Sequence, residues 1–260
     1  MGSLIFLYLL IIQLTPDSLL KESRQISNLF KKHNSAHLII ALADIYRLSL
    51  STIVLHWLQL TQYNEIMANS QSISQAQALR KTIRHRRQSL SKEQQLAAST
   101  ALSIQLLKNV PDNIKRVAIY LASDGEIDPQ LFIEGCWQRD IDVYLPVLHP
   151  FSRGNLLFLR YDKQTKMSVN KYGISEPALN VSLVLPARKL DIIYTPLVAF
   201  DAQGNRMGMG GGYYDRTLAA NPHVVTVGIA HDCQQVDELT VQPWDIALQR
   251  IITPTQNIVA

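Results

Sequence analysis

Apolar residues recur at the spacing of an α-helix between Ala76 and Leu90, while arginines occupy another face of the same stretch. Ser91 begins a second periodic segment, and the Lys-Glu-Gln that follows it is typical of a helix start. The pattern therefore predicts two consecutive helices, the second of which runs to about Asn109.

After Pro111 the apolar residues gather in short runs, which predict β-strands. The predicted strands are Arg116–Leu121, Val143–Leu148, Leu156–Tyr161, Asp191–Phe200 and Val224–Ala230. Two amphipathic stretches between strands, Pro129–Arg139 and Tyr213–Ala220, predict helices. Nearly continuous apolar strands that alternate with helices favour a mostly parallel sheet covered on both faces. The second and third strands are expected to form an antiparallel hairpin.

Glycine and proline divide the chain into two parts. The only ones before Met67 are Gly2 and Pro16, so 10 of 11 glycines and 10 of 11 prolines lie from Met67 onward. Because an α/β domain needs these residues at its turns, we predict that residues 67–260 form the functional domain and that residues 1–66 are an amino-terminal extension.

The extension contains two apolar runs, residues 4–14 and 37–60. Three interpretations fit it: a helical appendage, an interfacial anchor, or translated upstream sequence ahead of a start at Met67. We favour the third, because Met67 opens a polar stretch that is typical of a free terminus. No uninterrupted run reaches the roughly 20 apolar residues of a membrane span, so no membrane partner is expected.

Composition narrows the function classes. Of the 260 residues, 47% are hydrophobic and 18% are charged, with a formal net charge of +4. This is an ordinary globular balance, and the small positive excess does not require nucleic acid or an acidic membrane. The two cysteines, Cys136 and Cys233, exclude a disulfide framework and favour a reducing cytoplasmic compartment.

The most informative segment is a glycine-rich loop between a predicted strand and a predicted helix. Gly208 and Gly210–Gly212 allow consecutive backbone N–H groups to point at one anion. Arg206 can add a bidentate contact to phosphate oxygens, and Asp215 can hold a magnesium ion. A tight turn with close helix packing would explain the glycines alone, and the segment is neither a Walker loop nor a good dinucleotide fingerprint. The flanking residues therefore decide its meaning.

Those flanking residues match the sequence motif of a known protein family. The segment Arg206–Asp215 has the pattern R-x-G-x-G-x-G-[YF]-Y-D, and the chain from about Arg80 to Pro254 resembles the 5-formyltetrahydrofolate cyclo-ligase (methenyltetrahydrofolate synthetase) family. Further matching segments, in the family's order, are Tyr120–Asp128, Val143–Pro150, Asn155–Phe158, Thr195–Asp201 and Gly228–Asp232. The three consecutive glycines resemble those of the family's bacterial branch. Residues 1–66 have no counterpart in the family.

The resemblance implies a three-layer, Rossmann-like α/β fold with a mostly parallel central sheet, of the kind found in sugar-phosphate isomerases and CoA-transferases. It also implies that ATP and magnesium are required. The positions that would bind ATP are Arg80, Arg206, Met207, Gly208, Met209, Gly210, Gly211, Gly212, Tyr213 and Tyr214. Those that would bind magnesium are Asp215 and Asp245. Ala76 stands where the family often has a lysine, which weakens the match at the amino-terminal ATP contact.

The folate side of the site rests on the same resemblance. The positions that would bind the substrate are Leu121, Glu126, Met209, Gly210, Gly211, Gly212 and Tyr213. Taken alone, Glu126 is typical of a solvated turn ahead of a helix that Asp128 would cap. At the family position it would instead hold the pteridine, and a carboxylate suits that role because it accepts two hydrogen bonds from pterin N–H groups.

Two further patterns have simple interpretations. The basic run from Arg80 to Arg87 is expected to be a solvated helix face, or else to supply cations to a triphosphate or a polyglutamate tail. Because it lacks aromatic residues for stacking, we expect no nucleic-acid partner. The sequence His231-Asp232-Cys233 is not expected to be a catalytic pair, because neighbouring residues at a strand end point to opposite sides.

The resemblance implies an ATP- and magnesium-dependent conversion of 5-formyltetrahydrofolate to 5,10-methenyltetrahydrofolate, with release of ADP and phosphate. ATP would phosphorylate the formyl oxygen and N10 would then attack the activated carbon, so no side-chain nucleophile is needed. Such a reaction asks the protein for positioning and charge stabilisation. We expect a cytoplasmic monomer. Two alternatives stay open: an enzyme related to sugar-phosphate isomerases or CoA-transferases, and a non-catalytic folate-binding protein.

Overall fold

The computed structural model describes residues 50–242 and 244–259. The chain divides into two units, Met1–Gln75 and Ala76–Ala260, and the division falls inside helix α4 (Leu50–Gln88). The predicted apolar run 4–14 and most of the run 37–60 lie outside the described residues. No helix in the described part of the chain is long and apolar enough to span a membrane.

The unit Ala76–Ala260 is built on an eight-stranded sheet of order β12-β11-β10-β7-β1-β2-β3-β6. The strands are β1 (Arg116–Ala118), β2 (Asp142–Leu148), β3 (Leu156–Tyr161), β6 (Val184–Leu185), β7 (Ile192–Pro196), β10 (Val225–Ile229), β11 (Arg250–Ile252) and β12 (Asn257–Val259). The adjacent strands from β11 to β2 are parallel, whereas β12, β3 and β6 pair antiparallel at the edges. The mostly parallel sheet and the β2–β3 hairpin predicted from the sequence are confirmed.

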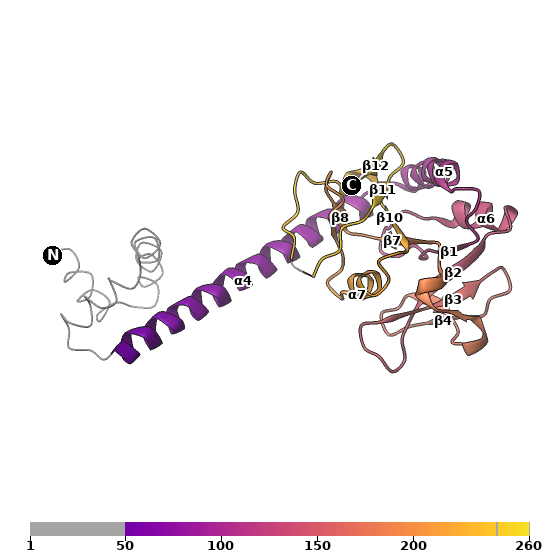
Figure 1. Ribbon diagram of the computed structural model, residues 1–260. Coiled ribbons are helices and arrows are strands. Elements are labelled where there is room, and N and C mark those ends of the chain that lie inside the picture. The colour runs from indigo at the N-terminus through magenta and orange to yellow at the C-terminus, as the bar shows by residue number, and fades with distance from the viewer. Residues whose placement is uncertain (1–49, 243, 260) are drawn as a thin grey trace. The chain divides into compact units, whose positions relative to one another are not determined.

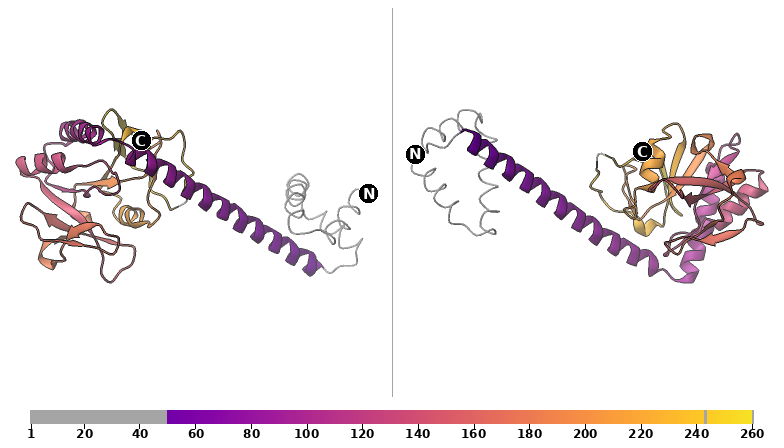
Figure 2. Two further views of the ribbon diagram at one scale, coloured as in Figure 1. Left: turned by 180° about the vertical axis from the view of Figure 1, so that it is seen from behind. Right: turned by 90° about the horizontal axis from the view of Figure 1, so that it is seen from below.

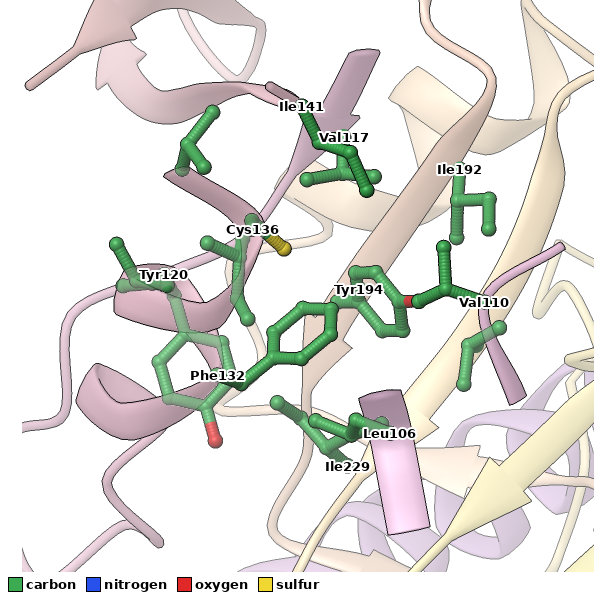
Figure 3. Packing of buried hydrophobic residues seen from close by; sticks show 14 of the residues in the cluster. Leu106, Val110, Val117, Tyr120, Phe132, Cys136, Ile141, Ile192, Tyr194 and Ile229 are labelled. Carbon is green, nitrogen blue, oxygen red and sulfur yellow. The ribbon is translucent and has the colours of Figure 1, made fainter. Parts of the chain in front are cut away.

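Helices cover both faces of this sheet (Figures 1 and 2). On one face lie α5 (Lys92–Asn109) and α6 (Gln130–Gln138), whose buried side chains join a core cluster with β1, β2, β7 and β10. On the other face α7 (Tyr213–Ala219) contributes Leu218 to a second cluster. Figure 3 shows the first cluster, where Phe132 of α6 meets Tyr194 of β7 edge to face at 5.0 Å. The expected three-layer architecture is thus confirmed.

The helices α5 and α7 begin where the sequence pattern predicts, whereas α4 begins at Leu50 rather than near Ala76. Ser91 caps α5 through a reciprocal capping box with Gln94, as its sequence predicts. The predicted strand Asp191–Phe200 is wrong as a single element, because it is divided into β7 and β8 (Ala199–Phe200). The N–H of Val198 donates to the carbonyl of Met207 over 2.7 Å, so the chain leaves the main sheet there to pair β8 with β9 (Arg206–Met207).

Shorter elements complete the unit. A two-stranded ladder joins β4 (Met167–Val169) to β5 (Ser175–Pro177), and 3-10 turns occupy Val181–Leu183, Ala187–Lys189 and Asp232–Gln234. The strands β1, β7 and β10 are neighbours and parallel, so their carboxyl ends open onto one edge of the sheet. Ligand sites of open α/β sheets form at that edge, outside the strand ends.

Candidate active site

The loop that follows β1 contains a tight turn, Ser123–Glu126. The N–H of its last residue donates to the carbonyl of its first over 2.9 Å, and the central residues Asp124 and Gly125 have φ values of 52° and 74°. Positive φ at both central positions is the signature of a type I′ turn, for which Asp-Gly is a preferred sequence. Glycine also fits the space, because a Cβ at position 125 would lie 3.2 Å from Cγ of Gln88.

The carboxylate of Glu126 is held inside the protein, with its side chain only 14% exposed. The N–H and the hydroxyl of Ser123 donate to Oε2 over 3.1 and 3.3 Å, and Nη1 of Arg87 lies 3.8 Å from Oε1. Burial raises the pKa of Glu126 above its ordinary 4.5, whereas Arg87 and the Ser123 hydrogen bonds act in the opposite direction. The solvated-turn interpretation of Glu126 is therefore wrong, since this carboxylate is desolvated and oriented.

One face of α4 supplies arginines to two different loops. Nε of Arg80 donates to the carbonyl of Gly208 over 2.8 Å. One turn and two turns further along the helix, Nε of Arg84 and Nη2 of Arg87 reach Oδ2 of Asp124 at 2.6 and 2.8 Å. The helix thus contacts both the glycine loop and the Ser123–Glu126 turn.

The expected solvated basic face is wrong for Arg87, which is completely buried. Its neighbour one turn earlier, Ile83, packs with Val198 and Ala199, so this side of α4 faces the domain interior. Hydrogen bonds from Arg84 first, and also from Arg87, lower the pKa of Asp124 from 3.8 to about 2. The turn therefore carries a carboxylate that stays ionised near neutral pH.

The glycine loop runs from β9 to the start of α7 and exposes its main chain. Gly210 and Gly212 have φ values of 93° and 64°, which side-chain-bearing residues rarely adopt. Met209, between two of the glycines, is 56% exposed. Within the described part of the chain, no hydrogen bond engages the backbone N–H groups of residues 208–212. These donors are free to bind an anion.

Arg206 and Asp215 lie in direct contact. Nη2 of Arg206 donates to Oδ1 of Asp215 over 2.7 Å, and the arginine side chain is only 3% exposed. Its buried Nε has no hydrogen-bond acceptor among the described residues. A buried guanidinium with an unused N–H can donate a further hydrogen bond to an anion such as phosphate.

The expected magnesium site can be compared with the ligands that magnesium prefers in proteins. Magnesium is usually held by one or two carboxylates together with substrate phosphates and water. Among the described residues no group of three or more His, Cys, Asp or Glu side chains gathers to form a metal cage. Asp215 beside an open glycine loop fits an ion that arrives with a nucleotide. Asp245 accepts a hydrogen bond from the N–H of Gln242 over 2.8 Å, which closes its own turn.

Tyr214, in the first turn of α7, is partly buried against the second core cluster. Burial raises the pKa of its phenol, and the charge of Glu126 acts in the same direction while that of Arg206 opposes it. The charges of Glu126 and Arg206 therefore both act on the Tyr214 phenol. Leu121, also expected at the substrate, is partly buried against the first core cluster just before the Ser123–Glu126 turn.

Arg216, in α7, makes contacts that the sequence did not reveal. Its Nε donates to the carbonyl of Gly154 in the β2–β3 loop over 2.8 Å, and its Nη2 donates to the carbonyl of Gly211 over 2.5 Å. The guanidinium also lies 5.8 Å from the ring of Tyr213, whose hydroxyl is 3.1 Å from that of Tyr172. Arg216 thereby connects the glycine loop to the β2–β3 loop.

In the segment His231-Asp232-Cys233, His231 is buried and Cys233 is half-buried. Burial first, and then the positive charge of Arg87, lower the pKa of His231 to about 4, so the imidazole is neutral near pH 7. Burial raises the pKa of the Cys233 thiol. The carboxylate of Asp232 accepts hydrogen bonds from Thr253 and Thr255 at 2.5 and 2.7 Å. A neutral imidazole and a protonated thiol do not form an activated nucleophile.

The model of the 5-formyltetrahydrofolate cyclo-ligase family matches residues 72–254. The chain belongs to this family. The 5-formyltetrahydrofolate cyclo-ligase of Escherichia coli (strain K12) is 49% identical over 177 residues, covering 67% of this chain and 97% of that protein.

Two further relatives agree with the cyclo-ligase family and its bacterial branch. The 5-formyltetrahydrofolate cyclo-ligase of Haemophilus influenzae is 46% identical over 179 residues, covering 68% of this chain and 96% of that protein. The solution structure of Aquifex aeolicus 5,10-methenyltetrahydrofolate synthetase superposes with a TM-score of 0.62 at 28% identity, covering 71% of this chain and 92% of that one. The family and the fold class inferred from the glycine loop are therefore confirmed.

Proposed function

We propose that this chain converts 5-formyltetrahydrofolate to 5,10-methenyltetrahydrofolate and consumes ATP with magnesium. The observation that carries the proposal is that α4 contacts both an open glycine loop, through Arg80, and the turn that ends in a buried carboxylate, Glu126, through Arg87. A carboxylate of this kind suits a pterin, and free backbone N–H groups suit a polyphosphate. Membership of the cyclo-ligase family joins the two in one reaction.

On the folate side, Glu126 would accept hydrogen bonds from the amino group and a ring N–H of the pterin. Its Oε2 is already oriented by Ser123, and Oε1 has only the more distant Arg87 as an ion-pair partner. The carboxylate therefore retains acceptor capacity toward a ligand. Leu121 would supply apolar contact beside it, and Met209–Tyr213 would border the substrate from the glycine loop.

On the nucleotide side, ATP with magnesium supplies the phosphoryl group that turns the formyl oxygen into a leaving group. The N–H groups of residues 208–212 would bind the phosphates, and Arg206 would stabilise their charge through its unused Nε–H. Arg80 holds the Gly208 carbonyl, which keeps the loop close to α4. Asp215 would hold the magnesium ion, with Asp245 as the second expected ligand. Positioning and charge stabilisation are the main demands of phosphoryl transfer.

We also propose that the protein acts as a cytoplasmic monomer. Both cysteines, Cys136 and Cys233, are free thiols, which is typical of a reducing compartment. Size-exclusion chromatography with light scattering on the full chain should return the mass of one chain, and a dimer mass would overturn this part.

The activity is tested with the purified full chain, 5-formyltetrahydrofolate, ATP and magnesium, by following the near-ultraviolet band of the methenyl product. We expect the band to grow only when ATP and magnesium are both present. Folded protein that forms no product would overturn the proposal. Turnover without ATP would favour a relative of the sugar-phosphate isomerases or CoA-transferases, and folate binding without turnover would favour a non-catalytic folate-binding protein.

A further inference from the structure

We propose that Arg87 is a positioning residue of the folate site, which clamps the Ser123–Glu126 turn to α4 and so directs the Glu126 carboxylate toward the pterin. The inference rests on the proposed function of Glu126 as the pterin ligand. It concerns a residue that would touch neither folate nor nucleotide and would act through the turn.

The guanidinium of Arg87 contacts acceptors from two strand-end loops. Nε donates to the carbonyl of Asp124 over 3.0 Å, and Nη2 reaches Oδ2 of the same residue at 2.8 Å. Nη1 donates to the carbonyl of Leu197, just beyond β7, over 3.4 Å and lies 3.8 Å from Oε1 of Glu126. The rigid, planar fork of arginine can serve these directions at once, which a single lysine ammonium cannot do.

The clamp also acts on a backbone position in the left-handed region, which Asp adopts more readily than most residues but still at a cost. Asp124 is one of only two non-glycine residues with positive φ in the described part of the chain. An L-residue in the left-handed region costs on the order of 1 kcal/mol or more, and it persists where surrounding contacts hold it. Arg87, Arg84 and Gln88 all donate to Asp124, so three side chains of one helix hold the strained position.

Arg87 also supplies the positive charge that Glu126 needs to stay ionised while buried. The negative charge of Asp124 raises the pKa of Glu126, and the charge of Glu126 in turn raises the pKa values of Arg84 and of the phenols Tyr120 and Tyr214. Loss of the Arg87 charge would therefore raise the pKa of Glu126 further. Its protonated form could no longer accept two hydrogen bonds from a pterin, so folate binding would require a higher pH.

Three variants separate this role from general stability. Arg87→Met removes the charge and the fork, Arg87→Lys keeps the charge, and Arg86→Met removes a neighbouring exposed arginine as the matched control. In the folate-free protein, carbon-13 NMR of labelled glutamate carboxyls reports the pKa of Glu126, with Glu126→Gln used for assignment. Folate affinity is then measured against pH without ATP, so that no chemistry intervenes.

For Arg87→Met we expect a pKa of Glu126 at least about one unit higher and, at pH values below it, folate affinity at least about tenfold weaker than in the wild type. Affinity should recover as the pH rises through the new pKa. Arg87→Lys should restore most of the pKa, with a smaller loss of affinity, and Arg86→Met should match the wild type. If Arg87→Met fails to fold, the lysine variant still tests the loss of the fork.

Two results would overturn the inference, and they differ from each other. An unchanged Glu126 pKa and an unchanged pH dependence in Arg87→Met would show that Arg87 does not act on the carboxylate. A raised pKa without any change in folate affinity would instead show that Glu126 is not the pterin ligand, which is a failure of the proposed function.

Discussion

The Ser123–Glu126 turn and the glycine loop are built in opposite ways. The turn is held by side chains, since Arg84, Arg87 and Gln88 all reach Asp124, and the carboxylate of its last residue, Glu126, is buried. The glycine loop is held at its edges, by Arg80 at Gly208 and by Arg216 at Gly211, while its backbone N–H groups stay free within the described structure.

The difference follows from what each region is proposed to bind. A pterin is flat and presents fixed N–H donors, so a single oriented carboxylate in a low-dielectric setting recognises it best. A polyphosphate is charged and presents many equivalent oxygens, so a row of backbone N–H groups with flanking arginines suits it. On this proposal, specificity for folate would reside in buried side chains and affinity for phosphate in the main chain.

The largest effect on turnover is expected at Asp215, which forms an ion pair with Arg206 beside the glycine loop. Asp215→Asn should lower turnover by about 10²–10³-fold, because the proposed magnesium ligand loses its charge. The asparagine oxygen can still accept from Arg206, so circular dichroism and thermal unfolding should show a folded protein. A turnover rate equal to that of the wild type would remove Asp215 from the site.

A smaller effect is expected on the folate side. Glu126→Gln keeps the shape of the side chain but replaces one acceptor oxygen with a donor, so folate affinity should fall by about 10- to 100-fold. In the wild type, folate binding should weaken as the pH falls through the Glu126 pKa, which burial places above 4.5. In Glu126→Gln, folate affinity should no longer fall with decreasing pH in this range, so the acid limb of the affinity profile should be absent. An unchanged limb measured by titration calorimetry would assign it to another group.

The smallest effect is expected at the contact that joins the glycine loop to the β2–β3 loop. Gly154 and Gly173 both have positive φ, 81° and 75°, so alanine strains each backbone by about 1–2 kcal/mol. A Cβ at 154 would also lie 2.7 Å from the guanidinium carbon of Arg216, whereas at 173 nothing lies within 4 Å. Gly154→Ala should therefore lower the Tm more than Gly173→Ala and raise the KM for ATP a few fold.

A double variant sharpens this last case. Removing the guanidinium with Arg216→Ala should relieve the added contact, so Gly154→Ala should cost less stability in that background than in the wild type. Equal costs in both backgrounds, measured by thermal unfolding, would show that Arg216 does not press on residue 154.

The glycine loop could be predicted from the sequence because its information is local. The glycines, Arg206 and Asp215 lie within ten consecutive residues, Arg206–Asp215. The strands β1, β2, β3, β7 and β10 and the β2–β3 hairpin could likewise be predicted from apolar runs, whereas β6, β11 and β12 were not predicted. The break after β7 could not, because it depends on Val198 pairing with Met207 rather than on any change in hydropathy.

The role of Arg87 could not be predicted for a related reason. An arginine within an amphipathic helix counts as a solvated residue, and its partner Asp124 is 37 positions away. Two signals were present in the sequence: Asp124-Gly125 is a type I′ turn sequence, and Arg87 lies one helical turn after Ile83, an apolar position of the periodic pattern. Neither feature identifies its partner in the sequence, so the contact between Arg87 and Asp124 could be found only in the folded structure.

The most direct measurement of the division between the two regions is a crossed binding experiment by titration calorimetry. Folate and a non-hydrolysable ATP analogue with magnesium are each titrated, without the other, into the wild type, Glu126→Gln and Arg206→Met. We expect Glu126→Gln to lose folate affinity and keep nucleotide affinity, and Arg206→Met to do the reverse. Variants that weaken both ligands equally, or the opposite ligands, would contradict the assignment of the turn to the pterin and of the glycine loop to the phosphates.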